Sequence, residues 1–344
     1  MPYISYFDLL GTRGFCDNPG IYYNNMNIFL STIKQMQIVI GDYGSVGVFS
    51  DCAYAESTDL YKLITFLSLV REKLMSHGLF MNGVIRKGRI GIQSYNDTEK
   101  SRFCAISFDG SDIADLYISQ TKFKGVGILL DESVYNEAQD NPEINITNCI
   151  FIKKNGETTK GNYLPIVYKD IAFPSSRYGN KSIEQSMRIV YNALFSAYVK
   201  SPKFAAYYIS ALSNIIRSYC SDFKWDLAKQ EFVNSSAIVK SILKMLTNYS
   251  EDINDLPGIE YLALILLDEV YKSSNLNEDE KRSITKKVVS IECVKKRFIH
   301  SLTEIPYGIF SVVKQEGASI DHREMFIRFC QEDLSMIFVD KIME

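Results

Sequence analysis

Several features that define common protein classes are scarce in this chain. Its 344 residues include seven cysteines, and no two of them have the C-x-x-C spacing. An odd number of cysteines without paired spacing argues against a disulfide framework and against a zinc site. We therefore expect most of them to be small buried hydrophobic residues in a reducing compartment.

Long apolar runs and an excess of charge are also missing. The longest apolar run, Tyr261 to Leu267, ends at Asp268, far short of the roughly 20 residues that cross a bilayer. The N-terminal segment has neither the basic start nor the apolar stretch of a signal peptide. We expect a cytoplasmic protein with no membrane span. The net charge of -3 gives no basic signature, so nucleic acid is not an expected partner.

The composition is that of a globular protein with a core, since 46% of the residues are hydrophobic and 23% are charged. The first half of the chain alternates strand and helix signals. The segment 58–76 is strongly amphipathic, with Leu60, Ile64, Leu67 and Val70 on one face. Strands are predicted at 3–7, 46–49, 53–55, 79–92, 103–108, 125–130, 150–152 and 163–167, and helices at 21–36, 58–76 and 110–120. This order indicates an α+β sheet layered with helices.

After about residue 180 the signals become helical, and no strand is predicted there. Ser182-x-x-Gln185 is a capping box at the head of one of these helices, and Asn277-x-x-Glu280 and Asp321-x-x-Glu324 are further predicted helix starts. We therefore expect two domains, residues 1–178 and an all-helical C-terminal region at 179–344. The sequence leaves the role of the helical region open, with a protein partner as one use for it.

Two aspartates stand out by position. Asp8 follows the first predicted strand, and Asp51 lies at the tip of a predicted hairpin. A carboxylate at the end of an apolar strand needs a partner, a cap or a metal. Two such groups on neighbouring strands suit Mg²⁺, which binds oxygen ligands and often takes its remaining ligands from the substrate's phosphates. The alternative is that Asp8 caps a turn and Asp51 is an ordinary hairpin residue.

Five short motifs, in this order, resemble class III nucleotidyl cyclases. They are Phe7-Asp8-Leu9-Leu10-Gly11, Phe49-Ser50-Asp51, Ile85-Arg86-Lys87-Gly88, Phe108-Asp109-Gly110 and Gly127-Ile128-Leu129-Leu130-Asp131. The resemblance covers about residues 1 to 140 and is greatest to the pyrimidine cyclases of Pycsar anti-phage systems. It implies a ferredoxin-like, cyclase-type βααββαβ sheet domain.

The resemblance also implies a site. Asp8 and Asp51 would be catalytic and would bind two divalent ions, Mg²⁺ or Mn²⁺, with the carbonyl of Leu9 completing one ion's ligands. The ions would activate the ribose 3′-hydroxyl and stabilise the phosphate charge as pyrophosphate leaves. Leu10, Gly11 and Thr12 would contact the nucleoside triphosphate. The family's site forms between two protomers, which implies a homodimer.

The chain departs from the family at two pairs of positions. Gly47 and Ser107 stand where purine cyclases read the base with a Lys and an Asp, which favours a pyrimidine. Ala114 and Ile118 fall near the places of the Asn and Arg that stabilise the transition state. Substitute cations are expected from the strand predicted at 79–92: Arg86 in a catalytic role, and Lys87 and Arg89 as substrate ligands. The alternative is that these three basic side chains simply form a solvent-exposed face of the strand.

The predicted function is the metal-dependent cyclisation of CTP or UTP to a 3′,5′-cyclic nucleotide, cCMP or cUMP, with a role in antiviral signalling. The alternative is a catalytically inactive cyclase-like module that senses a nucleotide or binds a protein.

Overall fold

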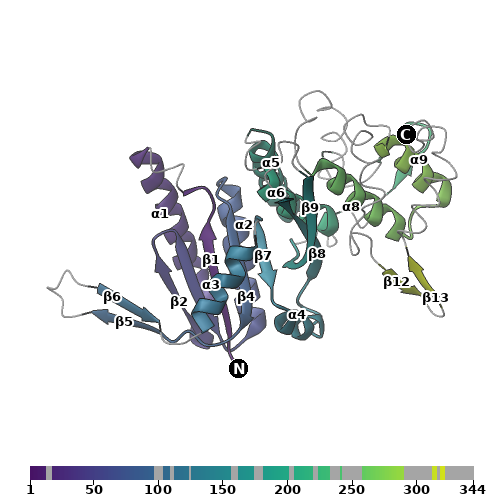
Figure 1. The fold of residues 1–344 in the computed structure, drawn as a ribbon. Coiled ribbons are helices and arrows are strands. Elements are labelled where there is room, and N and C mark those ends of the chain that lie inside the picture. Colours follow the sequence, from purple (N-terminus) through teal and green to yellow (C-terminus); the bar gives the residue numbers. More distant parts are fainter. Residues whose placement is uncertain are drawn as a thin grey trace. The chain divides into compact units, whose positions relative to one another are not determined.

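The structure of the chain is a computed structural model. It describes residues 1–12, 18–96, 104–108, 112–123, 125–155, 162–173, 181–200, 205–219, 224–232, 241, 258–289, 312–315 and 318–321. The chain divides into two compact units (Figure 1). The first comprises Met1–Thr147 with Tyr168–Ala172, and the second comprises Asn148–Val167 with Phe173–Glu344. The domain boundary at residue 178 stays a prediction.

A seven-stranded sheet, with strand order β2-β3-β1-β4-β7-β9-β8, organises the first half of the chain. Strand β1 is antiparallel to both of its neighbours, β3 and β4, whereas β4 and β7 are parallel. A parallel pair needs a long crossover connection, and the segment between β4 and β7 carries helix α3. The strand bounds are β1 Tyr3–Leu9, β2 Gly44–Phe49, β3 Cys52–Ser57, β4 Met81–Lys87, β7 Gly127–Leu130, β8 Ile146–Asn155 and β9 Asn162–Ile171.

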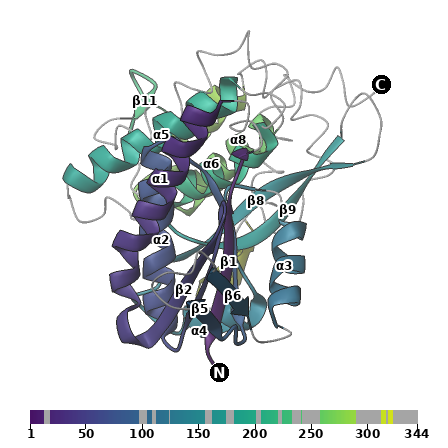
Figure 2. The ribbon, with the colours of Figure 1, turned by 90° about the vertical axis from the view of Figure 1, so that its left-hand side faces the viewer.

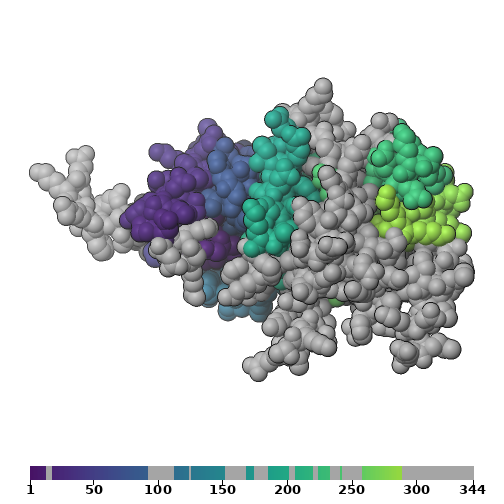
Figure 3. All heavy atoms as spheres, turned by 90° about the horizontal axis from the view of Figure 1, so that it is seen from above, coloured from purple at the N-terminus to yellow at the C-terminus, as the bar shows by residue number. Residues whose placement is uncertain are grey.

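Helices cover both faces of this sheet in the first unit. Helices α1 (Pro19–Met36) and α2 (Leu60–Ser76) lie on one face, and α3 (Asp112–Lys122) lies on the other (Figure 2). The first two pack side by side, as the purple and blue surfaces of Figure 3 show. The side chains of Asn18 and Asp59 cap their N-termini by accepting from the amides of Ile21 and Lys62. All three helices confirm the sequence prediction.

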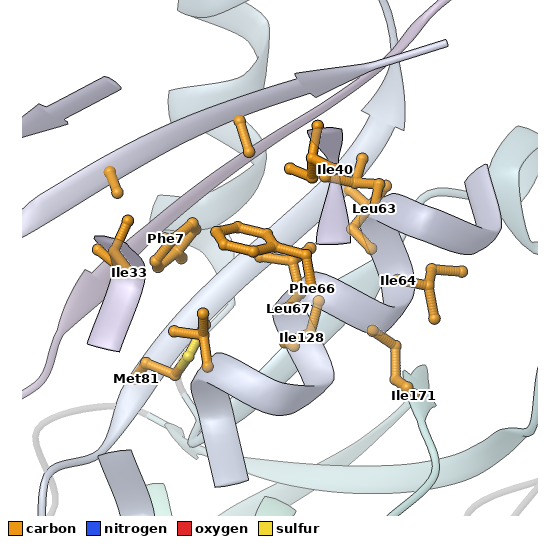
Figure 4. Close-up of a cluster of buried hydrophobic side chains, with 14 of the residues drawn as sticks. Phe7, Ile33, Ile40, Leu63, Ile64, Phe66, Leu67, Met81, Ile128 and Ile171 are labelled. Atoms are coloured by element: carbon orange, nitrogen blue, oxygen red, sulfur yellow. The ribbon is translucent and has the colours of Figure 1, made fainter. Parts of the chain in front are cut away.

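The alternation of β1 side chains explains the two-sided packing. Phe7 points toward α1 and α2, and its ring lies 6.3 Å from that of Phe29 and 6.2 Å from that of Phe66 (Figure 4). Ile4 and Tyr6 belong instead to the cluster that contains Leu116 of α3. Because successive side chains of a strand face opposite ways, every even-numbered residue of β1 from Ile4 to Asp8 is directed to the α3 face.

The observed order of elements corrects the predicted βααββαβ. One α-helix, α1, lies between β1 and β2, and it is followed only by the 3₁₀ turns η2 (Gln37–Val39) and η3 (Gly41–Tyr43). The chain cannot continue as an α-helix at Gly41, whose φ is +52°. The predicted strand 79–92 is also shorter, since β4 ends at Lys87 and a separate ribbon of β5 (Ile92–Asn96) and β6 (Cys104–Phe108) follows. Helix α4 (Glu132–Gln139) was not predicted.

A buried ion pair joins α2 to β9 within the first unit. The guanidinium of Arg71 lies 3.0 Å from Oδ1 of Asp170, and neither side chain is more than 1% exposed. Arg71 also donates to the carbonyl of Ile171 at 2.9 Å. The other oxygen of Asp170 accepts from the hydroxyl of Tyr168 at 2.9 Å. The charge of each group is thereby matched by its partner and by hydrogen bonds, which a buried ion needs.

The part of the second unit beyond residue 178, predicted to be all-helical, contains helices and two short hairpins. The described helices are α5 (Lys181–Lys200), α6 (Ala205–Tyr219), α8 (Ile259–Lys272) and α9 (Glu278–Val289). The hairpins pair β10 (Trp225–Asp226) with β11 (Glu231–Phe232), and β12 (Val312–Gln315) with β13 (Ala318–Asp321). Strands of two to four residues are too short to show a period of two in the sequence.

The helix start predicted at Asn277 is confirmed, since α9 begins at Glu278, whereas Asp321, also a predicted helix start, ends strand β13. The amide of Asn277 donates to Oε2 of Glu280 at 2.8 Å, and the amide of Glu280 donates to Oδ1 of Asn277 at 3.0 Å. Each side chain thus satisfies the other's backbone amide.

Across the described parts of both units, none of the helices combines the length and apolarity that crossing a membrane would take.

Candidate functional site

The two aspartates singled out in the sequence meet at one corner of the sheet. Asp8 lies inside β1 rather than after it, and it pairs with Cys52 of β3 on one side and with Asn82 of β4 on the other. Asp51 is the second residue of the two-residue turn between β2 and β3, and its carbonyl accepts from the amide of Leu9 at 2.9 Å. Paired strands lie about 5 Å apart. The backbones of Asp8 and Asp51 are therefore close neighbours, and both side chains are half-buried.

The turn after β1 closes against the Asp51 hairpin. The hydroxyl of Thr12 donates to Oδ2 of Asp51 at 2.6 Å. Gly11 has φ +81°, a left-handed conformation that favours glycine. The amide of Leu10 donates to the carbonyl of Phe80 at 2.8 Å. The segment Leu10–Thr12 is thus held beside Asp51, as the sequence prediction of a common site requires.

The hairpin tip that carries Asp51 holds backbone strain. Ser50 has φ 55°, and it is one of two non-glycine residues with positive φ among those described. Two-residue hairpin turns need a positive φ at a central position, and a non-glycine residue there costs about 1–3 kcal/mol. The strain is stored directly next to one of the two carboxylates.

A pair of amide side chains supports Asp8 from the α3 side. Gln120 of α3 donates through Nε2 to Oδ1 of Asp8 at 3.0 Å and to Oδ1 of Asn82 at 3.1 Å. Nδ2 of Asn82 donates to the carbonyls of Phe123 at 2.8 Å and Gly125 at 3.1 Å. These contacts connect the Asp8 carboxylate to the backbone at the end of α3.

Cys52 and Tyr6 lie in the field of the two carboxylates. The pKa of the Cys52 thiol is raised, chiefly by burial. The hydrogen bond with Tyr6 lowers this pKa, and the charges of Asp51 and Asp8 raise it. The pKa of Tyr6 is likewise raised, first by burial and then by Cys52 and Asp8. Both groups are therefore neutral at physiological pH, and the thiol is no candidate nucleophile. The negative charge of this corner resides on Asp8 and Asp51.

The three predicted cations lie elsewhere on the first unit. Arg86 pairs with Ile4 of β1, four positions from Asp8, which is about 14 Å along the strand. Its guanidinium is 3.5 Å from Oδ2 of Asp115, and Lys87 is 2.7 Å from Oε2 of Glu137. Arg89 is exposed. The structure does not bring these side chains together with Asp8.

The predicted base-reading positions are also separated from each other. Gly47 is buried in β2 opposite Tyr54, which in turn pairs with Tyr6. Ser107 lies in β6 opposite Gln93, in the separate two-stranded ribbon. Of the pair, only Gly47 belongs to the sheet that carries Asp8.

Helix α3 presents no charged or amide side chain at the two positions of the expected transition-state residues. Ala114 and Ile118 are both exposed, Ile118 by 48%. Tyr117 between them is 52% exposed, and its ring lies 5.9 Å from that of Tyr6. Neither Ala114 nor Ile118 therefore offers the polar side chain that the family pattern expects at these two positions.

The donor set at the corner fits a hard divalent cation. The carboxylates of Asp8 and Asp51 are oxygen ligands, and a carboxylate has about four acceptor sites, so an oxygen that accepts one hydrogen bond can still ligate a metal. Mg²⁺ is usually held by one or two carboxylates with water and phosphate as the other ligands. Within the described ranges no group of three or more His, Cys, Asp or Glu side chains is gathered for a metal. Two carboxylates suit an ion that shares its ligands with a triphosphate, not a closed protein cage.

No protein-family model matches this chain, and no curated protein matches it. Among solved structures, it is similar to the guanylyl cyclase Cya2 at 16% identity and a TM-score of 0.37, covering 52% of this chain and 94% of that one. A bacterial light-regulated adenylyl cyclase gives 13% identity, a TM-score of 0.35, and coverage of 55% and 97%. The adenylyl cyclase CyaB from P. aeruginosa gives 11%, 0.34, and coverage of 49% and 93%. Likenesses of this size do not assign the chain to a family.

Two residues of the corner, Asn82 and Gln120, were missed by the sequence prediction. Each left a signal. Asn82 interrupts the apolar run of β4 and is only 2% exposed, and Gln120 follows Leu116 by one helical turn on the buried stripe of α3 and is 7% exposed. A polar residue on a buried face needs a partner, and here the partners include each other.

Proposed function

We propose that the first unit is a divalent-cation-dependent nucleotidyl cyclase, which converts a nucleoside triphosphate to a 3′,5′-cyclic nucleotide and pyrophosphate. One observation carries the proposal: the pairing of β1 with β3, together with the Leu9–Asp51 hydrogen bond, gathers Asp8 and Asp51 at one half-buried corner. Two carboxylates at such a corner are the protein ligands that phosphoryl chemistry with Mg²⁺ or Mn²⁺ requires.

The residues of the corner have separate tasks in this proposal. Asp8 and Asp51 hold the cation, which would act as a Lewis acid on the ribose 3′-hydroxyl and the phosphates. Thr12 keeps the Asp51 carboxylate against the turn after β1 through its 2.6 Å hydrogen bond. The left-handed turn at Gly11 exposes backbone to an approaching triphosphate. Arg86 lies about 14 Å along the strand from Asp8 of its own chain, so the roles of Arg86, Lys87 and Arg89 stay predictions.

The identity of the substrate and the oligomeric state belong to the same proposal. A pyrimidine triphosphate, CTP or UTP, is favoured because Gly47 and Ser107 have no charged group with which to read a purine. A homodimer follows from the resemblance, in which a second copy completes the site. A role for cCMP or cUMP in antiviral signalling stays a prediction.

The test is turnover by the full-length chain. Each labelled nucleoside triphosphate is incubated separately with Mn²⁺ and the protein, and cyclic nucleotide and pyrophosphate are quantified. We expect CTP or UTP to be cyclised, and we expect Asp8→Asn and Asp51→Asn to lower the rate by at least 100-fold. Asp42→Asn is the matched control, because Asp42 is an exposed carboxylate in the turn η3. The proposal is overturned if none of the triphosphates is consumed, or if Asp8→Asn retains full activity.

A second candidate is an inactive module of the same architecture that binds a nucleotide and signals through a partner of the helical unit. The exposed Ala114 and Ile118 favour it, since neither can stabilise a transition state by charge or hydrogen bond. A nucleotide that raises the melting temperature in the presence of Mn²⁺, with no product formed, would select this candidate.

A further inference from the structure

The side-chain amide of Gln120 has only one orientation in which it can hydrogen-bond to both of its neighbours. Its side chain is 7% exposed, and Nε2 faces two oxygens, Oδ1 of Asp8 at 3.0 Å and Oδ1 of Asn82 at 3.1 Å. An amide NH₂ has two hydrogens to donate, so both are used. Rotating the amide by 180° would set its oxygen against two acceptors, which is repulsive.

Asn82 is oriented in the same way by the backbone. Its Nδ2 donates to the carbonyls of Phe123 and Gly125, at 2.8 and 3.1 Å. Carbonyl oxygens only accept, so the NH₂ of Asn82 must face them and its Oδ1 must face Gln120. The oxygen and nitrogen of an amide side chain are usually hard to tell apart. Here the assignment at both residues is fixed by neighbouring oxygens that only accept hydrogen bonds.

We propose that Asn82 and Gln120 are positioning residues for Asp8, acting as a relay of amides from the end of α3 to the carboxylate that holds the cation. The relay fixes Oδ1 of Asp8, and with it the plane of the carboxylate. Loss of a hydrogen bond that orients a metal ligand commonly changes metal affinity 10- to 100-fold. The inference rests on the proposed function, because it assigns a cation to Asp8.

A merely structural role for the two amides makes a different prediction. In that case their replacement lowers stability and leaves the cation affinity of the folded protein unchanged. The decisive quantity is therefore the dissociation constant of Mn²⁺ for the full-length chain. It is measured by electron paramagnetic resonance of free Mn²⁺, both without nucleotide and with a non-hydrolysable CTP analogue, because phosphates supply the cation's remaining ligands. Circular dichroism identifies variants that remain folded.

We expect Gln120→Met, which keeps length and volume but has no donor, to weaken Mn²⁺ binding by about 10-fold or more. Asn82→Leu should weaken it as well, and in the Gln120→Met background it should add nothing, because the two residues act in series. Ile128→Val is the control for lost stability, since Ile128 is fully buried in the first unit and is not among the residues of the corner. If Gln120→Met does not fold, Gln120→Leu replaces it.

The outcomes separate the inference from the proposed function. If the unaltered chain binds no Mn²⁺, both are overturned. If it binds Mn²⁺ and loses it on Asp8→Asn, while Gln120→Met binds as tightly as Ile128→Val, only the relay is overturned. Additive losses in the Asn82→Leu, Gln120→Met double variant would also reject a relay in series.

Discussion

The hydroxyl of Thr12 donates a 2.6 Å hydrogen bond to Oδ2 of Asp51, across 39 positions of sequence. Thr12 follows strand β1, and Asp51 lies in the turn of the hairpin that pairs with it. A hydrogen bond to a carboxylate is stronger than one between neutral groups. This contact therefore ties the turn after β1 to the hairpin tip and keeps one of the two acidic groups in place.

Replacing Thr12 by valine tests the strength of that tie. Thr12→Val keeps the shape and removes the donor, and we expect it to lower the free energy of unfolding by about 1–2 kcal/mol. Urea denaturation followed by circular dichroism measures the change. Thr121→Val is the matched control, because Thr121 donates only to the carbonyl of Ile118 in its own helix and is not buried. Equal effects of the two variants would contradict the interpretation.

The buried pair of Arg71 and Asp170 should be sensitive to the loss of either charge. Asp170→Asn leaves a guanidinium in the core without its counter-charge, and we expect a loss of about 3–5 kcal/mol. Arg71→Met should cost a comparable amount. Glu137→Gln serves as the comparison, because its pair with Lys87 is 44% exposed on the glutamate side, and exposed pairs contribute at most about 1 kcal/mol. A loss below 1 kcal/mol for Asp170→Asn would show that the core tolerates the charge.

Gly44 is predicted to be intolerant of any side chain. A Cβ at this position would lie 1.8 Å from the carbonyl oxygen of Glu56, which is backbone and cannot turn aside. Gly44→Ala must therefore separate the start of β2 from β3, and we expect a cost of about 3 kcal/mol or more. Gly20→Ala is the control, since its Cβ would meet only the side chain of Asn18, at 3.5 Å. Thermal unfolding of both variants gives the comparison.

Tyr3 makes the first unit sensitive to alkali. Burial, followed by the hydrogen bond to Glu137, raises the pKa of Tyr3 to about 12, above its ordinary value of about 10. The folded state therefore favours the protonated phenol. This contribution to stability is complete below about pH 10 and is lost as the pH rises through about 12.

We expect the free energy of unfolding to fall between pH 10 and 12, and to fall less steeply in Tyr3→Phe. Urea denaturation at intervals from pH 8 to 11.5 measures the slope. Part of the fall should remain in the variant, because the pKa of Tyr6 is also raised. An unchanged slope in Tyr3→Phe would rule out Tyr3 as a source.

The sequence was informative where a pattern is local. Amphipathic spacing predicted α2, and helices were also predicted at 21–36 and 110–120. The position of Asp8 and Asp51 at a strand end and a turn predicted their meeting. Register is not local. Arg86 and Asp8 are on adjacent strands, but the antiparallel pairing of β1 and β4 sets Arg86 opposite Ile4, and nothing in the two segments specifies that offset. The contact of Gln120 with Asn82 joins residues 38 positions apart and depends on how α3 crosses the sheet.

The route of the chain through the two units has a consequence for biosynthesis. The chain leaves the first unit after Thr147 and returns for Tyr168–Ala172, which supplies the carboxylate for Arg71. A nascent polypeptide that has emerged only to residue 147 therefore lacks Asp170, which pairs with Arg71 in the complete first unit. The first unit reaches its native state only after the excursion has been translated, and any shortened version intended for expression must extend at least to Ala172.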